Sequence, residues 1–255
     1  MEGISWQDAG GTGEAVVFMH PASCDSRVWE KQAPAITAAG LRFIAMDRRG
    51  YGRSAGTPGF AADDLEQLRR HLSLSRIFLV GTAAGGIHAV DYAISYPDAV
   101  AGLVVANSIV GVQDEEYVRL SQRLRPQPQF NALPDDFREL GPAYRASDAE
   151  GVVKWQALER AGRAHTPPPR PPAPPQTKNR ITYALLGAIR ARTLMITGDA
   201  DLYMPPPVLR LLASKMPNAR TLVIPECGHS AYWEQPEAFN RAVIDFVKAR
   251  SGTEP

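Results

Sequence analysis

Histidine is the side chain best suited to act as a general base near neutral pH, because its unperturbed pKa lies close to neutrality. The chain has five histidines: His20, His71, His88, His165 and His229. His71 lies late in a predicted amphipathic helix and His165 beside a proline-rich segment. The sequence favours packing for His88 and the ordering of a nearby loop for His20. His229 follows the last predicted strand and has a glycine before it, which predicts a turn at the carboxyl edge of a sheet. We therefore expect His229 to be a catalytic base.

A glycine-rich stretch, FLVGTAAGG at 78–86, raises the question of the nucleophile. It has the outline Gly-x-Ser-x-Gly, in which a serine is presented on a sharp turn between a strand and a helix. The middle position here is Ala83, which has no hydroxyl, thiol or carboxylate. The two thiols, Cys24 and Cys227, are candidate substitutes, but neither is predicted on a strained turn. We expect both cysteines to be small buried hydrophobic residues.

The elements that must position these residues follow an alternating pattern. Short, β-branched apolar segments alternate with longer amphipathic ones, as in a parallel sheet flanked by helices. Continuously apolar strands are typical of a sheet that is covered on both faces. The fold class predicted is therefore α/β, with a mostly parallel central sheet. The predicted strands are residues 15–20, 41–47, 76–81, 102–107, 192–198 and 220–226.

The alternation stops between residues 112 and 188. This interval predicts an inserted helical subdomain, with the core formed by residues 1–111 and 189–255. Seven prolines lie between Pro167 and Pro175, and they favour an extended polyproline conformation. We expect a stiff connector there, with recognition by a proline-binding partner as the alternative.

Five segments in order resemble the α/β-hydrolase fold superfamily, in particular its capped serine esterases and lactonases. They correspond to the family's strand and oxyanion loop, its D-x-x-G-x-G-x-S segment, its nucleophile turn, its acid loop and its histidine loop. The resemblance extends along nearly the whole chain, and residues 112–188 stand where the family has its cap. It implies an α/β-hydrolase fold with a helical, proline-containing cap insertion. The segments are VVFMHPASCDSRVW, MDRRGYGRS, VGTAAGG, TGDADLYMPP and PECGHSAYWEQPEAF.

The resemblance implies a catalytic triad in the chain order nucleophile, acid, histidine. The corresponding positions are Ala83, Asp201 and His229. The acid holds the imidazole in one tautomer and stabilises its cation. Asp199 is expected to shape the acid loop. Asn107, which stands where some members carry the acid, has no negative charge.

The resemblance also implies an oxyanion hole made by two backbone N–H groups. One is expected from Ala84, the residue after the nucleophile position. His20 and Pro21 stand where the family usually has His-Gly, and Pro21 has no N–H to donate. The second donor is therefore expected from Ala22, with Ser23 as the alternative.

Three explanations of Ala83 stay open. The favoured one is a serine hydrolase in which alanine has replaced the nucleophile, so that the protein holds its ligand without turnover. It is favoured because the other triad positions and the oxyanion loop keep the family pattern. The second is a natural ligand-binding or receptor-like homologue without catalysis. The third is a cofactor-free lyase or oxygenase in which His229 acts as a base without a covalent step.

The implied substrate is a small or medium acyl compound, either a carboxylic ester or a lactone. Amides and vinylogous C–C substrates are also compatible with the sequence. The family needs no cofactor, and the sequence has no ligand spacing of the kind zinc requires. The residues expected to line the pocket are Ser23, Tyr117, Phe130, Phe137, Tyr144, Trp155 and Trp233.

Composition bounds the partners and the compartment. With 28 basic and 27 acidic residues, the charge gives no indication of nucleic-acid or membrane binding. No apolar run approaches the ~20 residues that span a bilayer, and the N-terminus does not resemble a secretory signal. Two cysteines suit a reducing compartment. We expect a cytoplasmic protein that binds a small molecule, and the sequence gives no indication of its oligomeric state.

Overall fold

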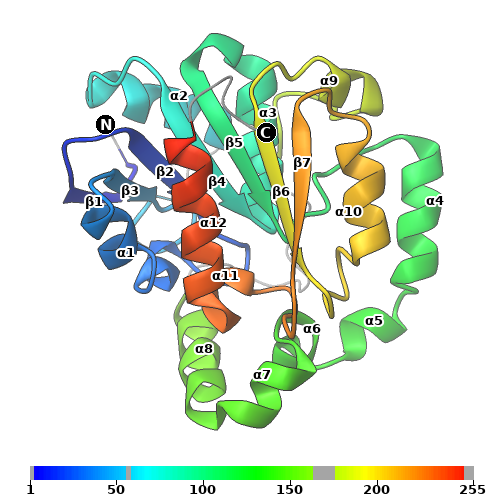
Figure 1. Ribbon diagram of the computed structural model, residues 1–255. Coiled ribbons are helices and arrows are strands. Elements are labelled where there is room, and N and C mark those ends of the chain that lie inside the picture. Colours follow the sequence, from blue (N-terminus) through cyan, green and yellow to red (C-terminus); the bar gives the residue numbers. More distant parts are fainter. Residues whose placement is uncertain (1–2, 56–58, 163–175, 250–255) are drawn as a thin grey trace.

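The protein is built around a central sheet. The computed structural model (Figure 1) describes residues 3–55, 59–162 and 176–249. Within these ranges one seven-stranded sheet has the order β1-β3-β2-β4-β5-β6-β7, and β1 alone runs antiparallel to its neighbour. This confirms the predicted α/β fold with a mostly parallel sheet. The strands are β1 (Trp6–Gly10), β2 (Ala15–Met19), β3 (Arg42–Met46), β4 (Ile77–Thr82), β5 (Val100–Ala106), β6 (Thr193–Gly198) and β7 (Ala219–Ile224).

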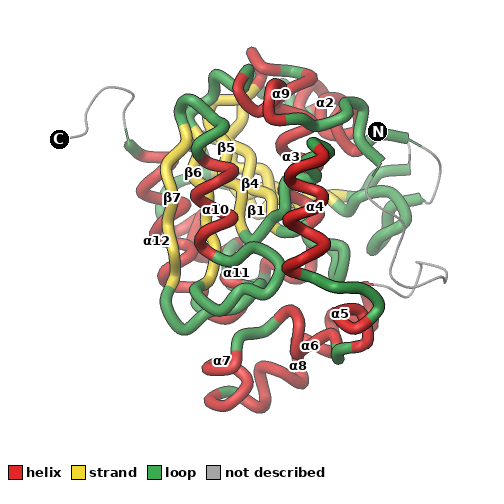
Figure 2. Tube along the Cα trace, turned by 90° about the vertical axis from the view of Figure 1, so that its right-hand side faces the viewer, coloured by secondary structure: helices red, strands yellow, loops and turns green. Residues whose placement is uncertain are grey.

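A hydrophobic cluster covers each face of the sheet, and successive residues of a strand point to opposite faces and so to different clusters. In β2, Val17 and Met19 belong to one hydrophobic cluster, whereas Val16 and Phe18 belong to the other. Helices cover each face, as Figure 1 and Figure 2 show. The first cluster includes residues of α2 (Ala61–His71), α3 (Ala84–Ser95) and α10 (Pro206–Ala213). The second includes residues of η1 (Ser26–Trp29), α1 (Ala33–Ala38), α11 (Ala231–Glu234) and α12 (Pro236–Lys248).

The interval between β5 and β6 is helical where it is described. Helices α5 to α8 lie beyond the end of the sheet at which α11 begins, whereas α4 lies beside α10 and α9 lies at the opposite end (Figure 1 and Figure 2). The division into core and cap stays a prediction. His165 and the proline run lie outside the described residues. The helices are α4 (Glu115–Leu124), α5 (Gln129–Ala132), α6 (Asp135–Glu139), α7 (Pro142–Ser147), α8 (Ala149–Gly162) and α9 (Tyr183–Gly187).

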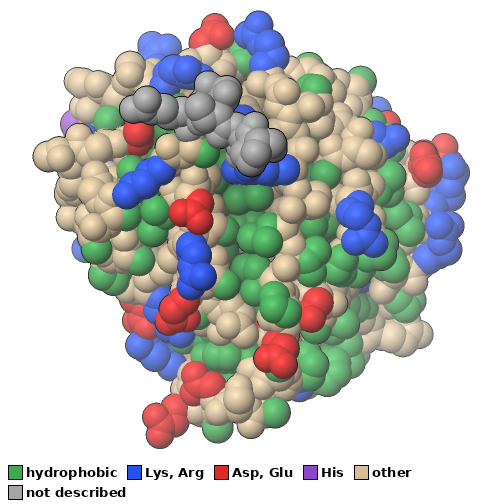
Figure 3. Space-filling view, viewed as in Figure 1, with side chains coloured by type: hydrophobic (Ala, Val, Ile, Leu, Met, Phe, Trp, Pro, Cys, Tyr) green, Lys and Arg blue, Asp and Glu red, His purple; other side chains and the backbone are tan. Residues whose placement is uncertain are grey.

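The surface shown in Figure 3 has basic and acidic side chains interspersed, in keeping with the net charge of +1. In the described ranges, the helices are all too short or too polar to cross a membrane.

Candidate active site

The acid and the histidine come from neighbouring parallel strands. Asp201 follows β6, and His229 follows β7. Parallel strands end at the same edge of a sheet, so the loops after them meet there. The Nδ1 atom of His229 lies 2.8 and 3.0 Å from the two carboxylate oxygens of Asp201. Both side chains are buried. The expected contact between acid and histidine is therefore present.

Further donors fix the Asp201 carboxylate. Oδ2 accepts hydrogen bonds from the Asn107 amide and the Thr197 hydroxyl, each at 3.0 Å. Oδ1 accepts the backbone N–H groups of Tyr203 at 2.8 Å and Met204 at 3.0 Å. Such bonds favour the charged form of a carboxylate. Asp201 is thus held as a fixed anion beside the imidazole.

The two members of the pair shift each other's protonation. Burial opposes the charge of Asp201, but the attraction and hydrogen bond of His229 outweigh it, and the pKa of Asp201 is lowered to about 2. Burial also opposes the charge of His229, whereas the Asp201 charge raises the pKa of His229 above its usual value. The arrangement therefore favours an imidazolium, which is the state that a general base reaches after accepting a proton.

Asn107, set aside in the sequence as a possible acid because it has no negative charge, instead donates hydrogen bonds that position the acid. Its Nδ2 group donates to Asp201 and also, at 3.1 Å, to the backbone oxygen of Gly228, next to the histidine. Its φ is 48°, in the left-handed region that asparagine tolerates better than most residues. Asn107 thereby joins the loop after β5 to both the acid loop and the histidine loop.

Ala83 lies on a strained turn between β4 and α3. Its φ is 49° and its ψ is −119°, a backbone conformation that costs free energy for a residue with a Cβ. The turn is tied to β5, because Ala83 N–H donates to the Ala106 oxygen and the Ala83 oxygen accepts from the Ser108 hydroxyl at 2.6 Å. The strand–turn–helix geometry of a nucleophile turn is thus present, with a methyl group at its tip.

Gly85 lets this turn approach the loop after β2. A Cβ at Gly85 would lie 2.0 Å from the Met19 oxygen and 2.7 Å from the His20 oxygen, which is far inside contact distance. The start of α3 therefore lies directly against the end of β2. This contact brings Ala84 next to the segment that contains Ala22.

Hydrogen bonds order the segment after β2. The Nδ1 atom of His20 lies 2.7 Å from the Pro21 oxygen, and His20 Nε2 accepts the backbone N–H of Arg48 at 3.0 Å. Such ordering of the loop is the role expected for His20. Ser23 is buried, and its hydroxyl has no hydrogen-bond partner among the described residues.

Aromatic residues extend from His229 toward the interval between β5 and β6. The ring of Tyr203 lies 4.2 Å from the His229 ring, centroid to centroid, and the Phe130 ring lies 5.0 Å from that of Tyr203. Arg138 donates to the Tyr203 hydroxyl at 2.9 Å. Tyr203 was not among the expected pocket residues, although its place two residues after the acid was a usable signal.

The other expected pocket residues lie in different surroundings. Tyr144, Trp155 and Trp233 belong to the second hydrophobic cluster, and Tyr117 belongs to the first. Phe137 is 41% exposed and lies under the Arg145 guanidinium. Their role as pocket walls stays a prediction.

The histidine loop is bonded to the corner between α6 and α7. The His229 N–H donates to the Glu139 oxygen at 3.1 Å. The buried Glu234 carboxylate accepts the N–H groups of Gly141 at 2.8 Å, Gly228 at 2.9 Å and Ser230 at 3.0 Å. One side chain therefore holds the histidine loop and the corner between α6 and α7 together.

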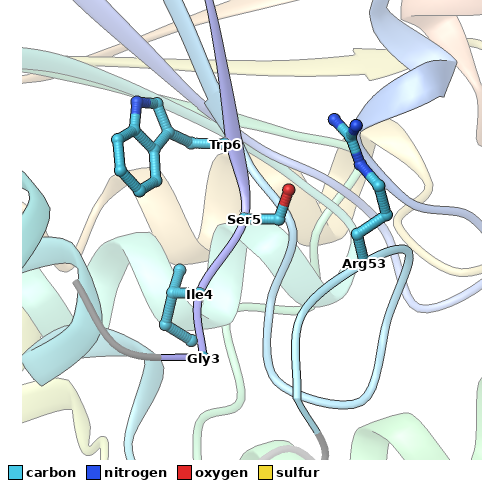
Figure 4. A pocket seen from close by; sticks show the side chains of 5 residues that line it. All are labelled: Gly3, Ile4, Ser5, Trp6 and Arg53. Atoms are coloured by element: carbon cyan, nitrogen blue, oxygen red, sulfur yellow. The ribbon is translucent and has the colours of Figure 1, made fainter.

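The two thiols are the other candidate nucleophiles, and Cys227 lies in the histidine loop, two residues before His229. Cys24 and Cys227 are buried, and burial raises the pKa of each thiol, so neither is a thiolate. Among the described residues, no three His, Cys, Asp or Glu side chains gather as a metal site would require. A separate pocket beside β1, with Arg53 on one wall, contains none of the expected site residues (Figure 4).

The fold and the Asp–His pair at the carboxyl edge of its sheet define the class of α/β hydrolases. The chain matches the profile of the alpha/beta hydrolase fold family over residues 14–236, and it belongs to that family.

Relatives and solved structures are similar along nearly their whole length. The chain is 29% identical to a 2-hydroxy-6-oxononadienedioate/2-hydroxy-6-oxononatrienedioate hydrolase of Burkholderia vietnamiensis, over 96% of this chain and 91% of that protein. A thermophilic esterase from Thermogutta terrifontis has a TM-score of 0.77 at 27% identity, over 96% of this chain and 93% of the other. An enol-lactonase from Burkholderia xenovorans LB400, at 20% identity, shares the fold with a TM-score of 0.75 over 96% of each chain.

Proposed function

We propose that this protein is a hydrolase of a small or medium acyl substrate, an ester or lactone, whose Ser-His-Asp mechanism is interrupted by alanine at position 83. The observation that carries this proposal is the hydrogen-bonded pair of Asp201 and His229 at the same sheet edge as a strained turn at Ala83. A strained backbone persists only where its surroundings impose it. Here a turn shaped to present a side chain presents only a methyl group.

In the complete mechanism each group has one task. His229 takes the proton from the attacking hydroxyl and later gives it to the leaving group, while Asp201 holds the ring and stabilises its cation. The N–H groups of Ala22 and Ala84 stabilise the negative charge on the substrate oxygen. The alanine chain keeps all of these except the hydroxyl, so we expect it to bind substrate without turning it over.

The names of relatives support an acyl or C–C substrate. The Burkholderia vietnamiensis relative is named as a hydrolase of dienedioates, and the two solved structures are named as an esterase and an enol-lactonase. Each of these names denotes a substrate with a carbonyl group, as a ketone, an ester or a lactone. A C–C bond next to a carbonyl is therefore the second substrate class to assay.

The test is Ala83→Ser, assayed against nitrophenyl esters, lactones and a vinylogous diketone, with labelling by a fluorophosphonate probe. Loss of the nucleophile in a serine protease costs on the order of 10⁶ in turnover, so restoring the hydroxyl is expected to produce a gain of several orders of magnitude. The matched control adds His229→Ala to Ala83→Ser, which keeps the hydroxyl and removes the base. A folded Ala83→Ser protein that is neither labelled nor active would favour a ligand-binding protein instead.

A further inference from the structure

Arg48, two residues after the end of β3, has a buried guanidinium with an unusual set of partners. Nη2 donates to the Pro21 oxygen at 2.9 Å, and Nη1 lies 3.3 Å from His88 Nε2. The guanidinium carbon lies 4.4 Å from the centre of the Tyr51 ring. His20 Nδ1 lies 3.4 Å from Nη2 and does not accept from it, because it carries a proton of its own. Among the described residues, no carboxylate forms an ion pair with Arg48, which is 6% exposed.

A buried cation with neutral partners is costly, because it has lost its hydration without gaining a counterion. Arginine cannot escape this cost by deprotonation. The two histidines beside it stay neutral, since burial and the Arg48 charge lower the pKa of His20 well below its usual value and that of His88 to about 3. Arg48 thus supplies a fixed positive charge at this place.

The first consequence concerns the peptide between Pro21 and Ala22. Its oxygen accepts from Arg48 on one side and from His20 on the other. His20 Nε2 accepts the Arg48 backbone N–H, so its proton lies on Nδ1, which donates to Pro21 O. In a trans peptide the C=O and the following N–H point in opposite directions. Fixing the Pro21 oxygen therefore fixes the direction of the Ala22 N–H, away from Arg48.

The second consequence concerns α3. His88 lies one turn after Ala84 on this helix, on the same side of it. Through Nη1 and Nη2, Arg48 therefore bridges the loop that contains Ala22 and the first turns of the helix that begins at Ala84. These are the two elements expected to provide the oxyanion donors.

We propose that Arg48 is a positioning residue for the oxyanion hole: it fixes the Pro21–Ala22 peptide relative to the start of α3 and places a positive charge behind both donors. This inference rests on the proposed hydrolase function. It explains what fixes the orientation of the oxyanion donors, which the sequence motif alone does not.

The kinetic test compares variants in the Ala83→Ser background. Arg48→Met removes the charge and both hydrogen bonds, while Arg48→Lys keeps the charge but loses the fork that bridges two partners. Removal of one oxyanion donor costs about 10²–10³ in kcat. We expect Arg48→Met to lower kcat by about 10²-fold with KM changed less than about threefold, and Arg48→Lys to lie between it and the parent. Arg53→Met, an exposed arginine of the same loop that lines the separate pocket (Figure 4), is the matched control and is expected to keep the parent kcat.

A structural test is independent of turnover. A crystal structure of the alanine chain with Arg48→Met is expected to show the Pro21–Ala22 peptide rotated from its present orientation, and Arg53→Met is expected to leave it unchanged. If Arg48→Met does not fold, Arg48→Lys provides both the kinetic and the crystallographic comparison.

The outcomes separate the two proposals. Inactive Ala83→Ser protein argues against the hydrolase function, and the peptide orientation in the crystal still decides the role of Arg48. Active Ala83→Ser protein with an unchanged kcat in folded Arg48→Met overturns the positioning role. A raised KM with unchanged kcat also overturns it, since that result assigns Arg48 to substrate binding.

Discussion

Asp201 differs from an ordinary loop aspartate in the number of donors that surround it. The sequence places it in a loop after a strand, but it does not show that Asn107, Thr197 and the following backbone all donate to its carboxylate. The Asn107 contact joins residues that are far apart in the chain, so no local pattern encodes it. The Thr197 and backbone contacts are local, but they depend on how the loop after β6 folds back on the carboxylate. The lowered pKa of Asp201, about 2, is the measurable consequence.

This lowered pKa predicts how stability depends on pH. An unfolded aspartate has a pKa of about 3.9, so below that value the unfolded chain binds a proton that folded Asp201 does not. The stabilisation by Asp201 is therefore fully present above about pH 5 and is lost as the pH falls toward 2. We expect the urea midpoint of the chain to fall between pH 5 and pH 3, and to fall less in Asp201→Asn.

The control for this experiment is Asp98→Asn, which changes an aspartate whose side chain is 96% exposed. Its urea midpoint is expected to follow the parent at each pH. An Asp201→Asn variant with the same pH dependence as the parent would contradict the ionised, hydrogen-bonded state of Asp201.

At the scale of elements, the apolar pattern was enough to predict the parallel strands but not to predict β1. The strands β2 to β6 are almost entirely buried and read as apolar runs, and the edge strand β7, although partly exposed, keeps an apolar run of its own. β1, in contrast, is the half-exposed edge segment Trp-Gln-Asp-Ala-Gly, and its pairing with β3 shifts register between Asp8 and Gly10. Its position depends on backbone pairing with β3 and not on a hydrophobic pattern, so the sequence offered no periodic signal for it.

The motifs located Ala83, Asp201 and His229, because each stands at a fixed place after a strand. They did not reveal the Tyr203 ring packed against the histidine, or Glu234 hydrogen-bonded to the histidine loop. Both contacts depend on how loops fold over the strand ends. Residue type and spacing are thus informative about which groups reach the sheet edge, and much less about what surrounds them there.

The contact of α3 with the end of β2 predicts a sharp difference between two glycines. Gly85→Ala would place a methyl group 2.0 Å from the Met19 oxygen, and we expect a loss of about 1–3 kcal/mol or more in the free energy of unfolding. Gly187→Ala, at the last residue of α9, meets only the Lys215 oxygen at 3.6 Å and is expected to stabilise by about 0.4–1 kcal/mol, because alanine restricts the unfolded chain.

Urea denaturation of both variants measures the difference. Since each change replaces a glycine by alanine, the reduced freedom of the unfolded chain alone would stabilise both. Equal midpoints for Gly85→Ala and Gly187→Ala would therefore contradict the close approach of α3 to β2.

For the whole molecule, the second hydrophobic cluster continues from the sheet into the helices between β5 and β6. Trp155 of α8 is fully buried in the same cluster as Phe18 of β2 and Phe239 of α12. We therefore expect these helices to unfold together with the sheet. Trp155→Ala is expected to cost about 3–5 kcal/mol, while Phe137→Ala, which removes a 41% exposed ring, is expected to cost much less.

Intrinsic fluorescence and far-ultraviolet circular dichroism, followed through urea denaturation, test this cooperativity. Coincident transitions that move together in Trp155→Ala are expected. An early transition confined to part of the helical signal, with the rest unchanged, would show that α8 unfolds separately.

The bonds that join Glu139, Gly141 and Glu234 to the histidine loop have a consequence for ligand exchange. The corner between α6 and α7 cannot swing outward without breaking the His229–Glu139 hydrogen bond and uncovering a buried carboxylate. We expect a ligand to enter and leave the site by movement of other segments, with this corner as a fixed support. A ligand that did displace the corner would displace the histidine with it, so the site could not be opened there and competent for proton transfer at the same moment.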